Sequence, residues 1–196
     1  HSEGLIALGE IQKREPVEVS DNLRNFNVLP GIARANYDIV VEKRMPELVT
    51  ITEESPLNKW TKGLGKTGVI TYGMSTVYVN EVKSLHDADI DILSLAYTNP
   101  LPIDLIEKFC DSITGDIYVF EDGYHYLQEE VERLGKTVIG KERYSKITEW
   151  SPALVAERLG YEVTYNKSEE PPVKRPPMIC PGCPYRLFAL NIAAMK

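Results

Sequence analysis

The amino-acid sequence predicts an α/β fold, a three-layer α/β/α arrangement with a mostly parallel sheet. Short β-branched runs alternate with segments of helical periodicity between residues 66 and 165, and such alternation favours parallel strands joined by right-handed helical crossovers. The chain has 196 residues, of which 43% are hydrophobic and 26% are charged. This length and composition suit one globular domain with additions.

Residues 1–65 are expected to form a connecting arm and a helix from a preceding domain. Apolar residues follow approximately helical spacing from residue 30 to residue 54. Pro46 has no backbone N–H and clashes with the preceding turn, so this helix should kink or restart there. Residues 59–67 are polar and rich in glycine, and they are expected to be a linker.

Short apolar runs are expected to form the sheet. Each is rich in β-branched or aromatic residues and is bounded by residues that favour turns. The strands are predicted at residues 68–73, 91–97, 116–120 and 137–139, with a candidate fifth strand at residues 161–165.

Helices are expected between these strands. Pro102 and Asp104 suit the first turn of one helix, whose apolar face includes Cys110. Gly135 should end the next helix, and Ser151 should cap the last one. The helices are predicted at residues 74–85, 102–113, 124–134 and 151–160.

The C-terminal part of the chain differs in composition from the rest. Residues 166–177 contain four prolines and several charges, which is typical of an exposed, semi-rigid linker. Residues 178–196 include an apolar helix at 186–195. A piece this small cannot bury its own faces, so we expect it to be the truncated start of a further domain.

Charge and hydropathy limit the partners. The net charge is −7, and the first 166 residues carry −10 while the remainder carries +3. An acidic surface repels a phosphate backbone, so we expect no nucleic-acid partner. The longest uncharged stretch, residues 92–103, contains two prolines and is shorter than the roughly 20 apolar residues of a membrane span. Without a basic leader followed by an apolar segment, the expected location is cytoplasmic.

The Cys180-Pro-Gly-Cys183 segment is the strongest chemical signal in the chain. Two thiolates at this spacing can share a metal ion, but a closed zinc or iron–sulfur site needs about four ligands. A structural turn and a redox-active pair remain alternatives. Cys110 is expected to be a buried, small hydrophobic residue and not a third ligand.

Polar residues follow two of the predicted strands at the carboxyl edge of the sheet, where ligands of such folds usually bind. A carboxylate beside His125 could exchange protons. The alternative is a polar loop whose Asp122 caps the following helix. We expect an interface here, with no catalytic or cofactor-binding residue. The predicted interface residues are Tyr97, Asn99, Glu121, Asp122, His125 and Tyr126.

Three segments carry a resemblance to a known family. They are Gly-Val-Ile-Thr-Tyr-Gly at 68–73, Leu-Ala-Tyr-Thr-Asn-Pro-Leu-Pro at 95–102 and Ile-Tyr-Val-Phe-Glu-Asp at 117–122. Their order resembles the transketolase-C-terminal-like domain of thiamine-diphosphate 2-oxoacid oxidoreductases. With Glu-Glu-Ser-Pro-Leu-Asn at 53–58 and the motif at 180–184, the chain is similar to the middle of the alpha subunit of indolepyruvate:ferredoxin oxidoreductases.

This resemblance implies a parent enzyme that oxidatively decarboxylates aryl 2-oxoacids, reduces ferredoxin and forms acyl-coenzyme A. It implies thiamine diphosphate, Mg and 4Fe-4S clusters in the parent, with none in these residues alone. The resemblance implies a pyrimidine-binding domain before this part of the chain and a pyrophosphate-binding domain that begins with residues 178–196. The implied partners are these other domains of the subunit, a smaller beta subunit, ferredoxin and coenzyme A.

These residues would then be a non-catalytic structural and interface domain, inactive in isolation. Cys180 and Cys183 match a region that ligates a cluster in related pyruvate enzymes. Tyr185 stands where the family commonly has His, which argues against a role in handling substrate. The alternatives are an autonomous metal or redox module built on the two cysteines, or a parent enzyme of pyruvate type.

Overall fold

The computed structural model describes residues 26–142, 149–164 and 185–195, together with residues 9–10, 13–16, 18, 21–22, 145, 179 and 183. The chain divides into two compact units, His1–Tyr161 and Glu162–Lys196. The first contains the sheet, and the second contains helix α7, Tyr185–Ala194. Helix α7 agrees with the helix predicted near the C-terminus.

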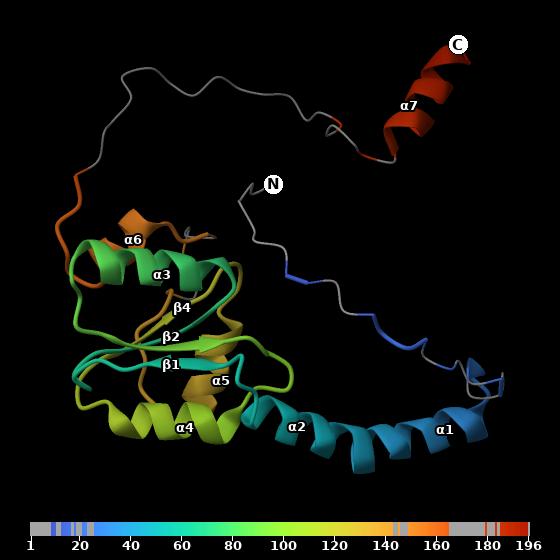
Figure 1. Ribbon diagram of the computed structural model, residues 1–196, viewed down its shortest axis with the longest axis horizontal. Coiled ribbons are helices and arrows are strands. Elements are labelled where there is room, and N and C mark those ends of the chain that lie inside the picture. The colour runs from blue at the N-terminus through green and yellow to red at the C-terminus, as the bar shows by residue number, and fades with distance from the viewer. Residues whose placement is uncertain are drawn as a thin grey trace. The chain divides into compact units, whose positions relative to one another are not determined.

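The first unit is built on a four-stranded sheet with the order β1-β3-β2-β4 (Figure 1). Its strands are β1, Lys59–Thr61; β2, Gly68–Tyr72; β3, Asp91–Leu95; and β4, Ile117–Phe120. Strands β3, β2 and β4 are parallel, whereas β1 pairs with β3 in the antiparallel direction. The predicted mostly parallel sheet is confirmed.

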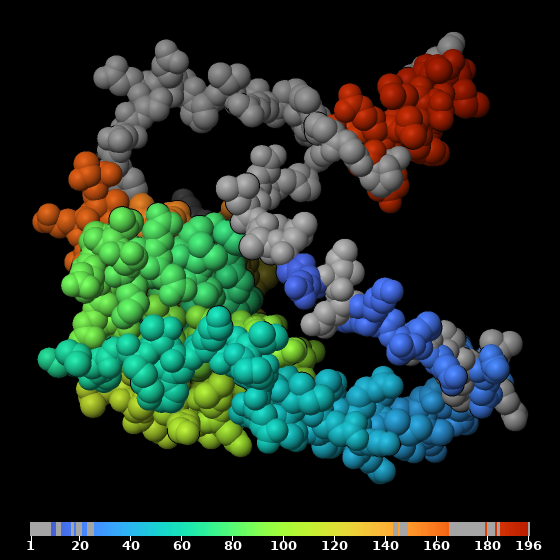
Figure 2. Space-filling model, in the orientation of Figure 1, coloured from blue at the N-terminus to red at the C-terminus, as the bar shows by residue number. Residues whose placement is uncertain are grey.

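Helices cover both faces of this sheet, which gives three layers. Helices α3, Met74–Leu85, and α6, Pro152–Arg158, lie on one face (Figure 1). Helices α4, Ile103–Ser112, and α5, Tyr126–Arg133, lie on the other. Figure 2 shows atoms of α3 in green and of α4 in yellow-green on either side of the cyan segment that contains β1. The α/β/α prediction is confirmed.

The core lies between the sheet and its helices. Val69 and Ile70 of β2 have no exposed surface, because β2 is a central strand with helices on both sides. Phe109 of α4 is also fully buried and meets the Trp60 ring edge-on, with ring centroids 5.2 Å apart. Burial of each such side chain stabilises the fold by about 1.5–3 kcal/mol.

Strand β1 corrects the expectation of a linker at residues 59–67. Its middle residue, Trp60, packs on Phe109, and its indole N–H donates to Asp91 Oδ1 at 3.2 Å. A Cβ added at Gly63 would lie 2.8 Å from the carbonyl carbon of Ile90, so this glycine permits a close approach of two backbones. Tertiary contacts therefore outweigh the polar local composition.

Two of the predicted strands are reduced or missing. The run at 137–139 contributes one parallel bridge, between Ile139 and Tyr118, and is not a full strand. Residues 161–164 form no strand, and residue 165 lies outside the described residues. Gly140 follows the bridge closely, and glycine weakens the interior of a strand.

The helix predicted from residue 30 onward consists of three consecutive parts. Helix α1, Pro30–Ile39, continues into a π-helical turn, Val40–Arg44, and then into α2, Met45–Glu53. The Met45 N–H donates to Val40 O, five residues earlier. A wider turn of this kind accommodates Pro46, which has no N–H to donate, so the predicted restart is confirmed. Within the described residues, no helix is long and apolar enough to cross a membrane.

Candidate functional site

The candidate site consists of two loops at the carboxyl edge of the sheet. One loop follows β3 and contains Tyr97 and Asn99, and the other follows β4 and contains Glu121. The Tyr126 hydroxyl donates to Thr98 O at 3.0 Å and joins the two loops. The structure therefore brings both predicted segments to one edge of the sheet.

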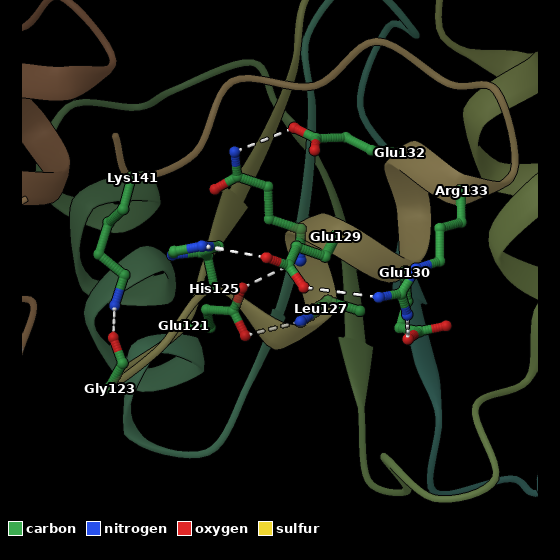
Figure 3. Close-up of polar contacts among 10 residues, drawn as sticks. Glu121, Gly123, His125, Leu127, Glu129, Glu130, Glu132, Arg133 and Lys141 are labelled. Carbon is green, nitrogen blue, oxygen red and sulfur yellow. Dashed lines mark hydrogen bonds and ion pairs between the residues drawn. The ribbon is translucent and has the colours of Figure 1, made fainter. Parts of the chain in front are cut away.

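Glu121 is the best-connected residue of this edge, and only 1% of its surface is exposed. Its carboxylate accepts from Leu127 N at 2.8 Å and from Gln128 N at 2.9 Å (Figure 3). The Tyr72 hydroxyl donates to the same carboxylate at 3.2 Å. Glu121 thus satisfies two backbone N–H groups in the first turn of α5, a role that favours a negative charge. The expectation that Asp122 caps this helix is wrong.

The electrostatics of Glu121 reflect its burial. Desolvation raises the pKa of the Glu121 carboxyl, and the hydrogen bonds from Gln128, Leu127 and Tyr72 offset part of this effect. Burial and the Glu121 charge raise the pKa of Tyr72 to about 12. Burial lowers the pKa of Lys141, whose ammonium donates to Gly123 O. The site is therefore a buried carboxylate with a nearby ammonium group.

Asp122 binds a residue that the sequence analysis did not single out. Its Oδ1 accepts from Trp150 N at 2.9 Å, and the Trp150 indole donates to Glu121 O at 3.0 Å. The Trp150 ring meets Phe120 edge-on at 4.8 Å between centroids. Only the aromatic character of Trp150 could have indicated this role, because it lies 28 residues away in sequence.

The acidic partner of His125 lies within α5. Its Nε2 lies 3.2 Å from Glu129 Oε1, one helical turn further on (Figure 3). The carboxylates of Glu121 and Asp122 bind backbone N–H groups instead. The suggested proton exchange between His125 and a carboxylate of its own loop is therefore not supported by this geometry.

The exposed part of the edge is aromatic and polar. Tyr124 is 89% exposed and Tyr126 is 42% exposed, while Asn99 is exposed and Tyr97 is partly buried. Tyr124 lies between two predicted interface residues but was not itself predicted. Exposed tyrosines with a polar surround are typical of contact surfaces, since tyrosine is enriched at interfaces.

A groove of about 490 Å³ lies near this edge, between the start of α3 and strands β1 and β3. Its charged lining residue is Lys59. Its lining contains no carboxylate, imidazole or thiol, so it offers no acid–base pair. The residues that line it are Leu57, Lys59, Thr61, Gly73, Thr76, Val77, Asn80, Ser94, Leu95 and Ala96.

The described residues do not fit a bound metal ion. Within them, no three or more His, Cys, Asp or Glu residues gather as a metal site would require. Cys183 is a partly exposed free thiol, and Cys180 lies outside the described residues. Cys110 is buried and free, and burial raises its pKa to about 11. The ligand role of Cys180 and Cys183 stays a prediction.

Comparisons with known proteins follow the resemblance noted in the sequence. No protein-family model matches the chain. The chain is 28% identical to indolepyruvate oxidoreductase subunit IorA of Archaeoglobus fulgidus, over 94% of its own length and 32% of that protein. It is 29% identical to the subunits of the same name from Methanothermobacter marburgensis and Thermococcus kodakarensis, over 98% and 99% of its length. The chain spans about a third of the length of these relatives.

A solved structure also resembles the chain, a 2-oxoglutarate:ferredoxin oxidoreductase from Magnetococcus marinus. The TM-score is 0.48 at 14% sequence identity, and the match covers 68% of this chain and 23% of the other.

Proposed function

We propose that the chain is a structural and interface domain in a subunit of a cytoplasmic 2-oxoacid:ferredoxin oxidoreductase that acts on indolepyruvate and related arylpyruvates. The observation that carries this proposal is the alignment of the chain with subunits named indolepyruvate oxidoreductase IorA. The alignments cover 94–99% of the chain at 28–29% identity. Because those proteins are called subunits, we propose a multi-subunit assembly with a smaller beta subunit, ferredoxin and coenzyme A as partners.

The proposed parts of the chain are those expected from the sequence, with β1, Lys59–Thr61, added to the middle part because it pairs with β3. The remainder of residues 1–65 connects to a preceding pyrimidine-binding domain, and residues 66–165 form the rest of the transketolase-C-terminal-like domain. Residues 166–177 are a linker, and residues 178–196 begin a pyrophosphate-binding domain. The hydrogen bonds at the carboxyl edge support a structural role for the middle part. Glu121, Asp122 and Tyr126 all bind backbone atoms that hold the fold together.

In the proposed reaction the carboxylate of the 2-oxoacid leaves as carbon dioxide, the electrons pass to ferredoxin, and the acyl group forms a thioester with coenzyme A. Thiamine diphosphate, Mg and 4Fe-4S clusters belong to the proposed parent enzyme. We assign none of these steps to the described residues.

The substrate class is tested with the purified complex that contains this subunit. Reduction of ferredoxin is measured with indolepyruvate, phenylpyruvate and pyruvate in the presence of coenzyme A. We expect higher kcat/KM for the two aryl substrates. A clear preference for pyruvate would instead identify the parent as a pyruvate-type enzyme.

The structural role is tested in the same complex with His125→Ala and Tyr126→Phe. Both variants should assemble and keep their kcat within a few-fold of the wild type. General acid–base groups typically contribute 10²–10⁴-fold to the rate. A loss of that size in an intact complex would assign catalysis to this edge.

A further inference from the structure

The segment Glu53–Asn58 joins the long N-terminal helix to the sheet. Glu53 is the last residue of α2, and Asn58 directly precedes β1. The Glu53 side chain binds backbone N–H groups in the first turn of α4, and the Asn58 side chain binds a backbone N–H group just after β3. Figure 2 shows the blue-to-cyan atoms of α2 continuing into the atoms of the α/β unit. The segment is one of those that carry the family resemblance, but the resemblance implies no function for it.

Glu53 supplies the N-terminal cap of α4. Its Oε1 accepts from Asp104 N at 2.9 Å, and its Oε2 accepts from Leu105 N at 3.0 Å. The residue before the helix is Pro102, whose side chain has no group that could cap it. A carboxylate is well suited to this position, because the first N–H groups of a helix are free and its N-terminus carries partial positive charge.

Asn58 connects the other side of the junction. Its Nδ2 donates to Thr52 O at 2.7 Å, and its Oδ1 accepts from Ala96 N at 2.8 Å. One amide group thus ties the last turn of α2 to the end of β3. Both hydrogen bonds are short and use both functions of the amide.

The rest of the long helix is far more exposed than its C-terminal end. Thr52 is 1% exposed, and it is the buried residue of α2, whereas α1 and the π-helical turn bury none. Exposed apolar residues include Tyr37, Ile39 and Val49. The direction of the helix is therefore set at its C-terminal end.

We propose that Glu53 and Asn58 form a clamp that fixes the direction in which α2 leaves the α/β unit. The local turn at residues 54–57 does not depend on the clamp, since Asn58 N donates to Ser55 O within the turn itself. When the clamp is open, α2 pivots about this turn. The clamp is also connected to the carboxyl edge of the sheet. Thr98 lies in the segment between Ala96 and Asp104, whose N–H groups the clamp binds, and Thr98 O accepts from the Tyr126 hydroxyl.

The test replaces Glu53 by Gln in the 196-residue chain. Gln keeps the size of the side chain but loses the charge and turns an N–H₂ group toward a backbone N–H. The matched control is Glu54→Gln, which removes the same charge from the adjacent, exposed residue. Amide hydrogen exchange reports on the cap, and a distance between two spin labels reports on the helix direction.

The spin labels are placed at Asp38→Cys of α1 and Lys108→Cys of α4, both exposed positions. Cys180 and Cys183 are replaced by Ser, whereas Cys110 is kept because it is buried. In Glu53→Gln we expect exchange at Asp104 and Leu105 to be about tenfold faster or more, as for loss of a charge-assisted hydrogen bond, and a clearly broader distance distribution. Glu54→Gln should match the wild type in both measurements.

Two results would overturn the clamp. In the first, Glu53→Gln lowers the unfolding midpoint but leaves the distance distribution unchanged, so Glu53 serves stability alone. In the second, neither exchange nor distance changes. Asn58→Asp is the second variant, because it keeps the acceptor for Ala96 N and removes the donor to Thr52 O. It should broaden the distance distribution less than Glu53→Gln, with an unchanged near-UV circular dichroism spectrum.

Discussion

Several carboxylates accept hydrogen bonds from backbone N–H groups outside their own helix or strand. Among them, Glu53 binds the start of α4, Asp91 binds Gly65 N at 2.8 Å, and Glu121 binds the start of α5. Each bond joins a charged acceptor to a neutral donor, the kind of hydrogen bond that is stronger than a neutral pair. Acidic residues in this protein therefore secure loops and helix ends.

Replacement of Glu121 by Ala is predicted to be severely destabilising. It leaves the N–H groups of Leu127 and Gln128 and the Tyr72 hydroxyl without their shared acceptor. Each buried donor left without an acceptor costs about 1–3 kcal/mol. Urea denaturation measures the loss. Glu132→Ala, at an exposed position of the same helix, should change stability by about 0.5 kcal/mol or less, and equal losses in both variants would contradict the prediction.

Asp91 and Glu121 are predicted to respond to pH in opposite directions. Burial opposes ionisation of Asp91, but hydrogen bonds from Gly63, Gly65 and Trp60 lower its pKa below 3.8. Its stabilisation is present above pH 3.8 and is lost as the pH falls through the folded pKa. The pKa of Glu121 is raised above 4.5, so its contribution is present below pH 4.5 and is lost as the pH rises through the folded pKa.

The measurement is urea unfolding of the wild type, Asp91→Asn and Glu121→Gln between pH 3 and pH 7. The free-energy advantage of the wild type over Asp91→Asn should shrink toward low pH. Its advantage over Glu121→Gln should shrink toward high pH. Parallel trends in the two variants would refute the assignment.

Cys110 is predicted to resist thiol reagents. It is 5% exposed, and its pKa is raised to about 11, so little thiolate forms at neutral pH. When native protein is treated with an aromatic disulfide at pH 8, peptide mapping should find Cys110 unmodified. In urea all three cysteines should react. Rapid native labelling of Cys110 would show that α4 opens readily.

At the scale of elements, α4 connects the sheet to the N-terminal helix. Its inner face carries Phe109, which contacts Trp60 of β1, and its first turn is capped by Glu53. Phe109→Ala should destabilise the protein by about 3–5 kcal/mol, because it leaves a cavity in the core. Thermal and urea unfolding measure this loss. Val77→Ala, at a position of α3 that is 53% exposed, should be nearly neutral.

The elements that the sequence predicted share a local signal. Strands β2, β3 and β4 are mostly apolar and are buried along most of their length, as expected for strands covered on both faces. Ser151 caps α6 as predicted, with Leu154 N donating to its hydroxyl at 3.3 Å. Strand β1 was missed because its three residues are polar at both ends. It forms through pairing with β3, which lies more than 30 residues further along the chain.

The candidate site was predictable in position but not in detail. The rule that polar groups gather at the carboxyl edge of parallel strands correctly located Glu121 and Tyr97. The hydrogen-bond partners of the residues at this edge depend on tertiary contacts. Trp150 reaches Asp122 from a loop 28 residues away, and Glu121 caps a helix that begins five residues later. No spacing rule for helix caps extends that far.

At the scale of the whole molecule, the first unit is a sheet with one antiparallel strand at its edge. That strand, β1, is continuous in sequence with the clamp and with α2. The long helix and the α/β unit are therefore structurally linked through residues 53–61. In the proposed enzyme, this link would carry the orientation of the preceding domain to the carboxyl edge.

The position of β1 determines where the protein can be cut. A recombinant piece that starts at residue 66 would lose β1, Asn58 and Glu53 together. The edge of β3 would then be free to pair with other molecules, and Phe109 would lose the ring that covers it. Such a piece is expected to aggregate, whereas one that starts at Met45 retains these contacts and should remain monodisperse in size-exclusion chromatography.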